Sequence, residues 1–375
     1  MVEKFKVTPW DVSGKVDYDK LIKEFGVSKI DDALLKRIEK ASGELHFMLR
    51  RKIFFAHRDL KWIMDEYEKG SKPFLYTGRA PSGPVHLGHL LPWIFTKWLQ
   101  DKLGLELWFQ FPDEEKFLMK NNLEFEDGQK FLQENMLDVI AIGFDPKKTH
   151  FIIDTKHAGI MYKEACKVAK KITFSMVKSS FGMNEQSNIG SIFYTSMQAV
   201  PAFLPSVING KRIPCLIPHA IDQDPHFRLT RDIMPRIGHY KPASIQCSFL
   251  PPLSGAEGKM SSSESTTSIL TTDTPKEVEK KIKRYAFSGG KDTIEEHRKK
   301  GGNPEVDVSF QYLRMLFEPN DEKLKQIEED YRSGKLLTSE LKEILIKKIN
   351  AFLAEHQRNR EKAKKDIDKF IFNIK

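Results

Sequence analysis

The sequence predicts an α/β protein in which a mostly parallel sheet, with helices on both faces, is followed by an all-helical C-terminal region. Two observations predict this fold class. Between residues 74 and 272, short apolar runs alternate with helical patterns, as in repeated βα units. From residue 274 onwards, apolar residues recur at helical spacing. We therefore expect an N-terminal extension over residues 1–70 that packs on an α/β domain over 71–272, and a helical domain over 273–375.

Composition sets the broad class of the protein. The chain has 375 residues, of which 40% are hydrophobic, so it can bury more than one core. A formal net charge of +9 suits a polyanionic partner. Three widely separated cysteines support neither a zinc or iron–sulfur site nor a disulfide framework. The sequence has no long apolar run and no apolar signal core at its start, so we expect a cytoplasmic protein without a membrane span.

The N-terminal extension is expected to be largely helical. Apolar stripes at helical spacing predict three helices, at residues 17–25, 29–42 and 59–69. Arg50, Arg51 and Lys52 form a short basic run between the second and the third. We favour an exposed, solvated turn for this run over a contact with nucleic acid.

Five strands are expected in the α/β domain. They are the apolar runs at residues 74–76, 105–111, 151–153, 212–217 and 244–250. Helices are expected after residue 89 and at 131–141, 159–170 and 196–203. Polar segments follow the strands at 77–89, 110–116, 222–224 and 254–263. Because ligands of such sheets bind outside the carboxyl ends of the strands, we expect these four segments to converge on one site.

The helical domain begins with a clear helix start. Thr274 and Glu277 form a capping box around Pro275 at the first helical position. Glycine-containing loops are expected at residues 289–290, 301–302 and 333–334, and the last amphipathic helix contains residues 341–352. The dense charge run at residues 358–365 fits a solvated helix end and a nucleic-acid contact equally well.

The segment from Tyr76 to His89 carries the first chemical signal. It predicts a strand, a glycine-rich turn and a helix. A helix that starts after such a turn offers free N–H groups and a positive dipole end, which suit a phosphate. His86 and His89 can both face the same anion, and Gly88 leaves room for a flat ring such as a purine. A structural role for the glycine and the two histidines remains open on this segment alone.

A second segment, residues 258–263, places Lys259 and three serines in a glycine-led loop. Together the two segments resemble the paired signatures of class I aminoacyl-tRNA synthetases. The HIGH-type signature is His86-Leu-Gly-His89, and the KMSKS-type signature is Lys259-Met-Ser-Ser-Ser263. The second departs from the family pattern at Ser262, where the usual second lysine is missing.

Three further segments resemble one branch of that class, the tryptophanyl-tRNA synthetases of the eukaryotic and archaeal type. They are residues 76–83, 220–232 and 286–297. The resemblance implies a Rossmann-like, doubly wound catalytic domain and a helical anticodon-binding domain. It also implies a homodimer that activates L-tryptophan with ATP and Mg²⁺ and transfers it to tRNA(Trp).

The resemblance also implies site residues. The tryptophan site would use Tyr76 and Gln110 as acceptors for the indole N–H, Glu115 and Gln198 for the amino group, and Gln223 for the carboxylate. The ATP site would comprise Arg79, His86, Gly88, His89, Asp222, Lys259, Met260 and Ser261. Of these, His86, His89, Lys259 and Ser261 are expected to be catalytic, and no protein metal ligand is expected. Glu115 in a charged surface turn, Gln198 as a capped core residue and Asp222 as a cap remain alternatives.

Three other functions stay open. The tyrosyl enzyme shares the architecture, but its site needs a partner for a phenol hydroxyl where this chain has Gln110. A small-molecule nucleotidyltransferase would share the nucleotide loop, yet it would not need the helical domain. A catalytically silent tRNA-binding relative would not need His86, His89 and Lys259.

Overall fold

The computed structural model of the chain describes residues 17–120, 122–255, 260 and 266–373, and the backbone of 6–7 and 12–13. Its centre is a seven-stranded sheet in the order β3-β4-β9-β8-β5-β6-β7. The strands are β3 (Ser28–Lys29), β4 (Phe54–Arg58), β5 (Phe74–Gly78), β6 (Glu106–Phe111), β7 (Thr149–Ile153), β8 (Cys215–Ala220) and β9 (Ala243–Cys247). Two short strands, β1 (Lys6–Val7) and β2 (Val12–Ser13), pair separately as an antiparallel hairpin.

The five strands from β5 to β9 are parallel, which confirms the predicted mostly parallel sheet. From β5 the chain proceeds outwards to β6 and β7, and then returns to the other side of β5 for β8 and β9. The order of the strands therefore reverses between β5 and β8. In an open parallel sheet such a reversal leaves a crevice at the carboxyl ends of the strands, where ligands bind.

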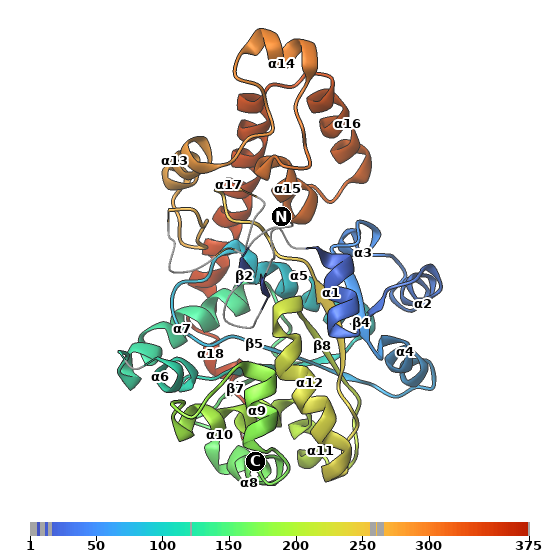
Figure 1. The fold of residues 1–375 in the computed structure, drawn as a ribbon, viewed down its shortest axis with the longest axis vertical. Helices are drawn as coiled ribbons and strands as arrows, with labels where there is room; N and C mark the ends of the chain where they lie inside the picture. The colour runs from blue at the N-terminus through green and yellow to red at the C-terminus, as the bar shows by residue number, and fades with distance from the viewer. Residues whose placement is uncertain are drawn as a thin grey trace.

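Helices surround this sheet (Figure 1). Those before residue 240 are α1 (Tyr18–Phe25), α2 (Asp32–Ser42), α3 (Phe47–Arg50), α4 (Leu60–Glu68), α5 (Leu87–Leu103), α6 (Glu115–Met119), α7 (Phe125–Ala141), α8 (Ala158–Ala169), α9 (Phe174–Phe181), α10 (Ile189–Met197), α11 (Leu204–Ile208) and α12 (Asp224–Ile233). Short 3₁₀ turns lie at η1 (Val200–Ala202), η2 (Ile221–Gln223) and η3 (Met234–Ile237). None of the described helices has both the length and the apolar character that crossing a membrane requires.

The C-terminal region is helical, as predicted, and forms the upper part of the molecule in Figure 1. Its helices are α13 (Pro275–Tyr285), α14 (Ile294–Lys300), α15 (Val308–Tyr312), α16 (Asp321–Arg332), α17 (Thr338–Ala363) and α18 (Ile367–Phe370), with a π-helical turn at η4 (Leu313–Phe317). The predicted capping box is present, because the Thr274 amide donates to Glu277 Oε2 at 2.8 Å and the Glu277 amide to Thr274 Oγ1 at 3.3 Å.

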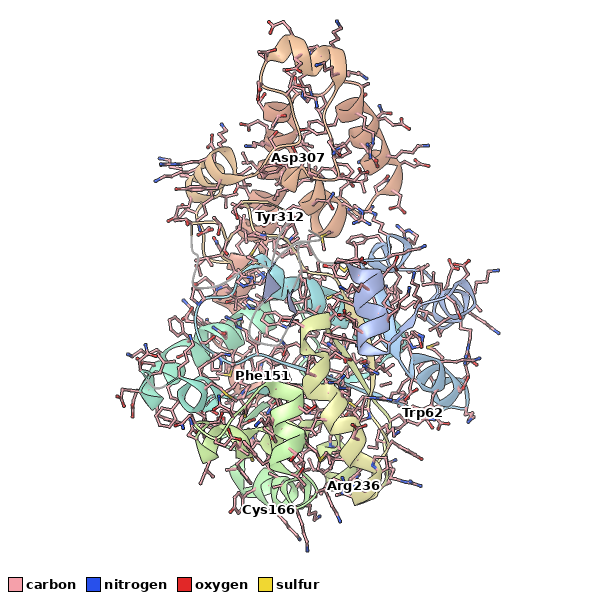
Figure 2. All side chains as sticks on the ribbon, viewed as in Figure 1. Trp62, Phe151, Cys166, Arg236, Asp307 and Tyr312 are labelled. Atoms are coloured by element: carbon pink, nitrogen blue, oxygen red, sulfur yellow. The ribbon has the colours of Figure 1, made fainter. Side chains whose placement is uncertain are left out.

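One buried carboxylate organises the upper helices. Asp307 accepts hydrogen bonds from the Tyr331 hydroxyl at 2.7 Å and from the Gly289 amide at 2.9 Å. Tyr312 lies below it, towards the sheet (Figure 2), and its hydroxyl donates to the Pro251 carbonyl oxygen at 2.7 Å. The helical region is thus attached directly to the segment that follows β9.

The last helices return to the sheet. Helix α17 descends from the upper part and packs along α7. After α18 the Phe372 amide donates to the Phe151 carbonyl oxygen of β7 at 3.0 Å, so the chain ends along the edge of the sheet. Phe151 lies deep in the lower body in Figure 2.

Strand β4 comes from the segment expected to form the extension. It pairs antiparallel with β9, so this segment is continuous with the main sheet. No strand was expected here, because the apolar run is short and the segment ends in the polar residues His57 and Arg58. Arg58 forms a buried ion pair with Asp224 at 2.7 Å, which explains how a charged residue can end a strand in the sheet.

Several element boundaries differ from the prediction. Helix α7 begins at Phe125 and not at residue 131, and β9 ends at Cys247 and not at residue 250. The strand expected at 212–217 lies at Cys215–Ala220, because Pro214 has no N–H to donate to a ladder. The helix expected at 196–203 is instead the end of α10 followed by η1, and Pro201 lies within that turn.

In the basic run at residues 50–52, Arg50 and Lys52 are exposed and residues 51–52 form a turn, so the predicted solvated turn is confirmed except at Arg51. The Arg51 side chain is 8% exposed and forms an ion pair with Asp321 at 2.6 Å. It also donates to the carbonyl oxygens of Arg314 and Glu318. Arg50 pairs with the same aspartate. These arginines therefore join the N-terminal region to the upper helices.

Candidate active site

A cavity of about 310 Å³ lies at the carboxyl ends of β5, β6, β8 and β9. This is the position that the reversal of strand order predicts. Eleven of the thirteen predicted site residues line it: Tyr76, Arg79, His86, Gly88, His89, Gln110, Glu115, Gln198, Asp222, Gln223 and Met260. The other two, Lys259 and Ser261, lie outside the described residues, as do the serines that follow them.

The loop before α5 is hydrogen-bonded to the segment that follows residue 265. The Leu87 amide donates to the Ile269 carbonyl oxygen at 3.0 Å, and the Thr271 amide donates to that of Val85 at 3.0 Å. Helix α5 begins at Leu87, with His86 as its cap residue. The predicted sequence of strand, glycine-containing loop and helix is therefore confirmed, and Met260 of the second signature segment lies next to Gly88 of the first.

The two histidines of the loop form one unit. Their rings stack with centroids 3.5 Å apart, and the His86 amide donates to His89 Nδ1 at 3.2 Å. Gly88 lies against this unit, since a Cβ atom there would stand 3.1 Å from the His86 ring and 3.5 Å from Met260 Cβ. A side chain at this position would therefore be tight against the His86 ring, whereas its distance to Met260 would be an ordinary contact. The predicted role of Gly88 beneath a purine ring stays a prediction.

Arg79 connects the loop to the rest of the domain. Its Nη1 lies within hydrogen-bond distance of His89 Nε2, and its Nη2 donates to the carbonyl oxygens of Gly83 and Pro84, both at 3.1 Å. Its Nε donates to Asn135 Oδ1 on α7 at 2.6 Å. Burial lowers the pKa of Arg79 to about 10, so the guanidinium remains charged at neutral pH.

Asn135 was not predicted from the sequence. Besides accepting from Arg79, it donates from Nδ2 to the Gly83 carbonyl oxygen at 3.0 Å, so it fixes both the guanidinium and the loop. Its single sequence signal was an amide on the apolar face of a helical pattern, which is too common to indicate a site.

Three other side chains form a chain of hydrogen bonds that begins at the cavity wall. The Tyr76 hydroxyl donates to Gln110 Oε1 at 2.6 Å. Gln110 Nε2 in turn lies 3.0 and 2.7 Å from the two carboxyl oxygens of Asp154. Asp154 was also missed, although it directly follows the predicted strand at 151–153, where polar residues of a parallel sheet gather.

Glu115 lies in the wall of the cavity and is not a plain surface residue. It accepts from Lys116 at 2.7 Å and from the Tyr194 hydroxyl at 3.1 Å. Burial acts to raise the pKa of Glu115, but Lys116 and the hydroxyl outweigh it, so its pKa lies below the usual value. This carboxylate therefore stays negative inside the cavity.

The side-chain amides of Gln198 and Gln223 differ in their hydrogen-bond partners. Gln198 caps the C-terminus of α10, and its Oε1 is buried without a hydrogen-bond partner among the described residues. Gln223 donates from Nε2 to Asp222 Oδ2 at 3.2 Å. A buried acceptor without a partner is rare in proteins, so Gln198 is suited to receive a donor from a bound molecule.

Two cavity histidines, His219 and His226, were not predicted as site residues. Burial lowers the pKa of His226 to about 4 and also lowers that of His219, so both are neutral at neutral pH. Neither has a sequence signal beyond its place at or after the end of a predicted strand, since His219 lies in β8 and His226 in α12.

The two ends of the cavity have opposite chemistry. Arg79 and the paired histidines offer donors and positive charge to an anion. Tyr76 and Gln110 offer acceptors in an apolar surrounding, where the Phe227 ring meets that of Tyr76 edge-on at 5.9 Å. A ligand that fits would be anionic at one end and carry a ring donor at the other, with a cationic group near Glu115.

Comparison with known proteins gives the family. Residues 68–354 match the family described as tRNA synthetases class I (W and Y). The Tryptophan–tRNA ligase of Sulfolobus acidocaldarius is 52% identical over 374 residues, which is 100% of this chain and 97% of that protein. The Tryptophan–tRNA ligase of Pyrococcus furiosus is 49% identical over 376 residues, covering 100% of this chain and 96% of that protein.

Solved structures agree in fold over nearly the whole chain. The tryptophanyl-tRNA synthetase from Giardia lamblia superposes with a TM-score of 0.89 at 40% identity and covers 95% of this chain and 96% of that one. The enzyme from Encephalitozoon cuniculi, solved bound to tryptophan, gives 0.84 at 35% identity, over 95% of this chain and 99% of that one. With the first signature segment and Met260 of the second at one cavity, and with this similarity along its length, the chain belongs to the class I tRNA synthetases of the tryptophan and tyrosine group.

Proposed function

We propose that this protein is a tryptophan–tRNA ligase, which activates L-tryptophan with ATP and then transfers it to tRNA(Trp). The observation that carries the proposal is the pair of acceptors, Tyr76 and Gln110, at the end of the cavity opposite Arg79 and the histidines. The similarity to tryptophan–tRNA ligases over the full length supports the same function.

Tryptophan would lie with its indole N–H against Tyr76 Oη and Gln110 Oε1. A phenylalanine ring would leave these buried acceptors unpaired, at a cost of about 1–3 kcal/mol per group. Glu115 and Gln198 Oε1 would accept from the ammonium group of the amino acid. The Gln223 amide would donate to its carboxylate without neutralising it, so the carboxylate keeps its nucleophilic character.

The first step needs no general base, because the carboxylate of tryptophan is already ionised at neutral pH. One of its oxygens attacks the α-phosphorus of ATP in line, the bond to the bridging oxygen breaks, and pyrophosphate leaves. The protein positions the two reactants and stabilises the charge that spreads over the phosphates. We assign this work to Arg79, His86 and His89, together with Lys259 and Ser261.

ATP would enter the site with Mg²⁺ on its phosphates. Within the described part of the chain, no group of three His, Cys, Asp or Glu side chains is arranged to hold a metal ion. Asp222, which lines the cavity, is the carboxylate that could contact the ion or the ribose. Magnesium often binds through one or two carboxylates and substrate phosphates, and this donor set fits that mode.

In the second step a hydroxyl of the 3′-terminal adenosine of tRNA attacks the tryptophanyl carbonyl carbon, and AMP leaves. The helical region, for which we keep the proposed boundaries 273–375, would read the anticodon, since loop bases are read by stacking and by hydrogen bonds to their edges. The net charge of +9 supports binding of a polyanion. Three free cysteines are in keeping with a reducing compartment such as the cytoplasm.

We also infer a homodimer. Two neighbouring helices, α8 and α10, present large apolar side chains to the outside: Ile189 is 83% exposed and Tyr162 is 61% exposed. Phe193, one turn from Ile189, contacts the Tyr162 ring. Exposed apolar groups that gather in this way indicate a protein contact. Light scattering of the protein should give twice the chain mass, and Ile189→Glu should reduce it towards one chain.

The decisive experiment is ATP–pyrophosphate exchange with each of the standard amino acids, first without tRNA and then with it. Exchange with tryptophan alone is the expected result. Exchange with tyrosine alone would replace the proposed substrate and assign the chain to the tyrosyl enzymes. No exchange under either condition would mean a catalytically silent relative.

A further inference from the structure

We propose that Asp154 determines the amino-acid selectivity of this site, by fixing the orientation of the Gln110 amide so that only acceptors face the ring of the substrate. Asp154 is a positioning residue, because it acts through Gln110. The inference rests on the proposed function and adds a residue to the recognition of the tryptophan side chain.

The geometry leaves the amide one orientation. Asp154 is 1% exposed and Gln110 is 2% exposed, so both side chains are buried. Both carboxyl oxygens of Asp154 lie within 3.0 Å of the same nitrogen, Gln110 Nε2. The backbone is held too, because the Asp154 amide donates to the Phe111 carbonyl oxygen at 3.2 Å. Reversing the amide would place Oε1 against the carboxyl oxygens and lose both contacts.

This orientation decides what the cavity offers to a ligand. With Nε2 turned to Asp154, Oε1 is free to accept the proton of the Tyr76 hydroxyl at 2.6 Å. Each oxygen keeps a further lone pair, so the pair Tyr76–Gln110 acts as an acceptor towards an indole N–H. A reversed amide would present N–H groups instead, and these would suit the phenol oxygen of tyrosine. Asp154 thus excludes the donor arrangement.

The groups around Asp154 allow it to accept the hydrogen bond from Gln110 Nε2. Burial, together with the neighbouring Glu114 carboxylate, raises the pKa of Asp154. Burial likewise raises the pKa of Glu114, to about 7. A protonated Asp154 that shares its proton with Glu114 still turns its carbonyl oxygen to Gln110 Nε2. The next carboxylate, Asp113, is occupied by Gln129 and Thr155 and does not contact Gln110 in the structure.

The test compares tryptophan with β-(3-benzothienyl)alanine, in which sulfur replaces the ring N–H, and with tyrosine. Each is assayed by ATP–pyrophosphate exchange with the wild-type protein and with Asp154→Asn, whose side chain has nearly the same shape. The wild type should prefer tryptophan to the sulfur analogue roughly 10- to 100-fold in kcat/KM. Asp154→Asn should reduce this preference about tenfold through the KM for tryptophan, and exchange with tyrosine should rise.

Asp113→Asn is the matched control, because it makes the same change in the same cluster without touching Gln110. It should keep the wild-type preference. A purely structural role for Asp154 would lower the activity with all three amino acids alike and leave their ratios unchanged.

The outcomes separate the inference from the proposed function. A wild type that exchanges with tryptophan, beside an Asp154→Asn variant with unchanged ratios, would overturn the inference alone. A wild type that does not exchange with tryptophan would overturn the proposed function as well. Thermal denaturation checks folding, and if Asp154→Asn does not fold, Asp154→Ser provides the same comparison with a smaller side chain.

Discussion

The two ends of the cavity are built in different ways. The end with Tyr76, Gln110 and Asp154 is formed by the last residues of neighbouring strands and the residue just after one, so the register of the sheet places them. The end with Arg79, His86 and His89 is formed by one loop and the start of α5. That loop is held by Asn135 on α7 and by the segment around Ile269. The residues proposed to recognise the ring are thus positioned by the sheet. The anion-binding residues are positioned by contacts with α7 and with the segment around Ile269.

The anion-binding end is also connected to the C-terminal helices. Asp138, one turn from Asn135 on α7, is buried and forms an ion pair with Arg360 of α17. His356 Nε2 lies 2.9 Å from the other oxygen of Asp138. The charge of Asp138 also favours the protonated form of Arg79. One helix therefore carries the contacts to the loop and the contacts to α17, whereas β7, the strand that precedes Asp154, is linked to the C-terminal residues through the backbone of Phe372.

The largest expected effect comes from breaking the link between α7 and α17. Arg360→Met should lower the free energy of unfolding by about 3–5 kcal/mol, because the buried Asp138 carboxylate loses its strongest partner. The KM for ATP should rise while the KM for tryptophan stays nearly constant. Urea denaturation and exchange kinetics measure these quantities. Arg358→Met is the control, since Arg358 is exposed on the same helix and should change stability by no more than about 0.5 kcal/mol.

The anion-binding end itself is tested by Arg79→Met. The kcat of ATP–pyrophosphate exchange should fall roughly 10²- to 10³-fold, as when a donor to a developing negative charge is removed. The KM for tryptophan should change little, since the contacts of the Arg79 guanidinium are with Asn135, His89 and the loop, and not with the side chains of Tyr76 and Gln110. Arg79→Lys keeps the charge but not the forked geometry, so it should recover only part of the loss. An equal loss of tryptophan binding would show that the two ends are not independent.

The opposite end is tested by Gln110→Ala. Removing one buried acceptor should cost about 1–3 kcal/mol, which corresponds to a rise of roughly 5- to 150-fold in the KM for tryptophan. The KM for ATP should be unaffected. Exchange measured at varied tryptophan and tyrosine concentrations gives both the affinity and the selectivity. An unchanged preference for tryptophan would remove Gln110 from the ring site.

The smallest expected effect concerns His46, which does not line the cavity. Its titration contributes to the pH dependence of stability. His46 Nδ1 accepts from the Met48 amide at 3.2 Å and so caps α3. Burial, together with the charge of Arg50, lowers the pKa of His46 from 6.5 to about 4. Because the unfolded chain takes up this proton first, the stability from this group is complete above pH 6.5 and declines as the pH falls towards 4.

His46→Asn keeps an acceptor at the cap and removes the titrating ring. Between about pH 7 and pH 5 it should lose less stability than the wild type, by roughly 2 kcal/mol, which is what a group with a pKa lowered from 6.5 to about 4 contributes over this range. Urea denaturation at the two pH values measures this difference. Equal losses in the two proteins would mean that His46 does not contribute to acid sensitivity.

The sequence was enough to predict the alternation of strands and helices, because buried parallel strands are short apolar runs and the breaks between them carry glycine and proline. Strand β4 escaped prediction, since it ends in His57 and Arg58 and owes its place to the ion pair with Asp224. Arg51 was misinterpreted for a related reason. A charged run is expected to be solvated unless other parts of the chain supply hydrogen-bond acceptors. For Arg51 the acceptors are two carbonyl oxygens and a carboxylate of residues after 313.

By itself the sequence determined the fold class, the two signature segments and the polar residues that follow each strand, since these depend on local spacing and on the rule that strand ends converge. The tertiary structure alone decided which side chains orient the others. Asn135 reaches Arg79 from α7, and Asp154 reaches Gln110 from the neighbouring strand. Such contacts join residues that are 56 and 44 positions apart, so no local pattern records them. They exist because folding removes water from these groups and each must then find a partner in the protein.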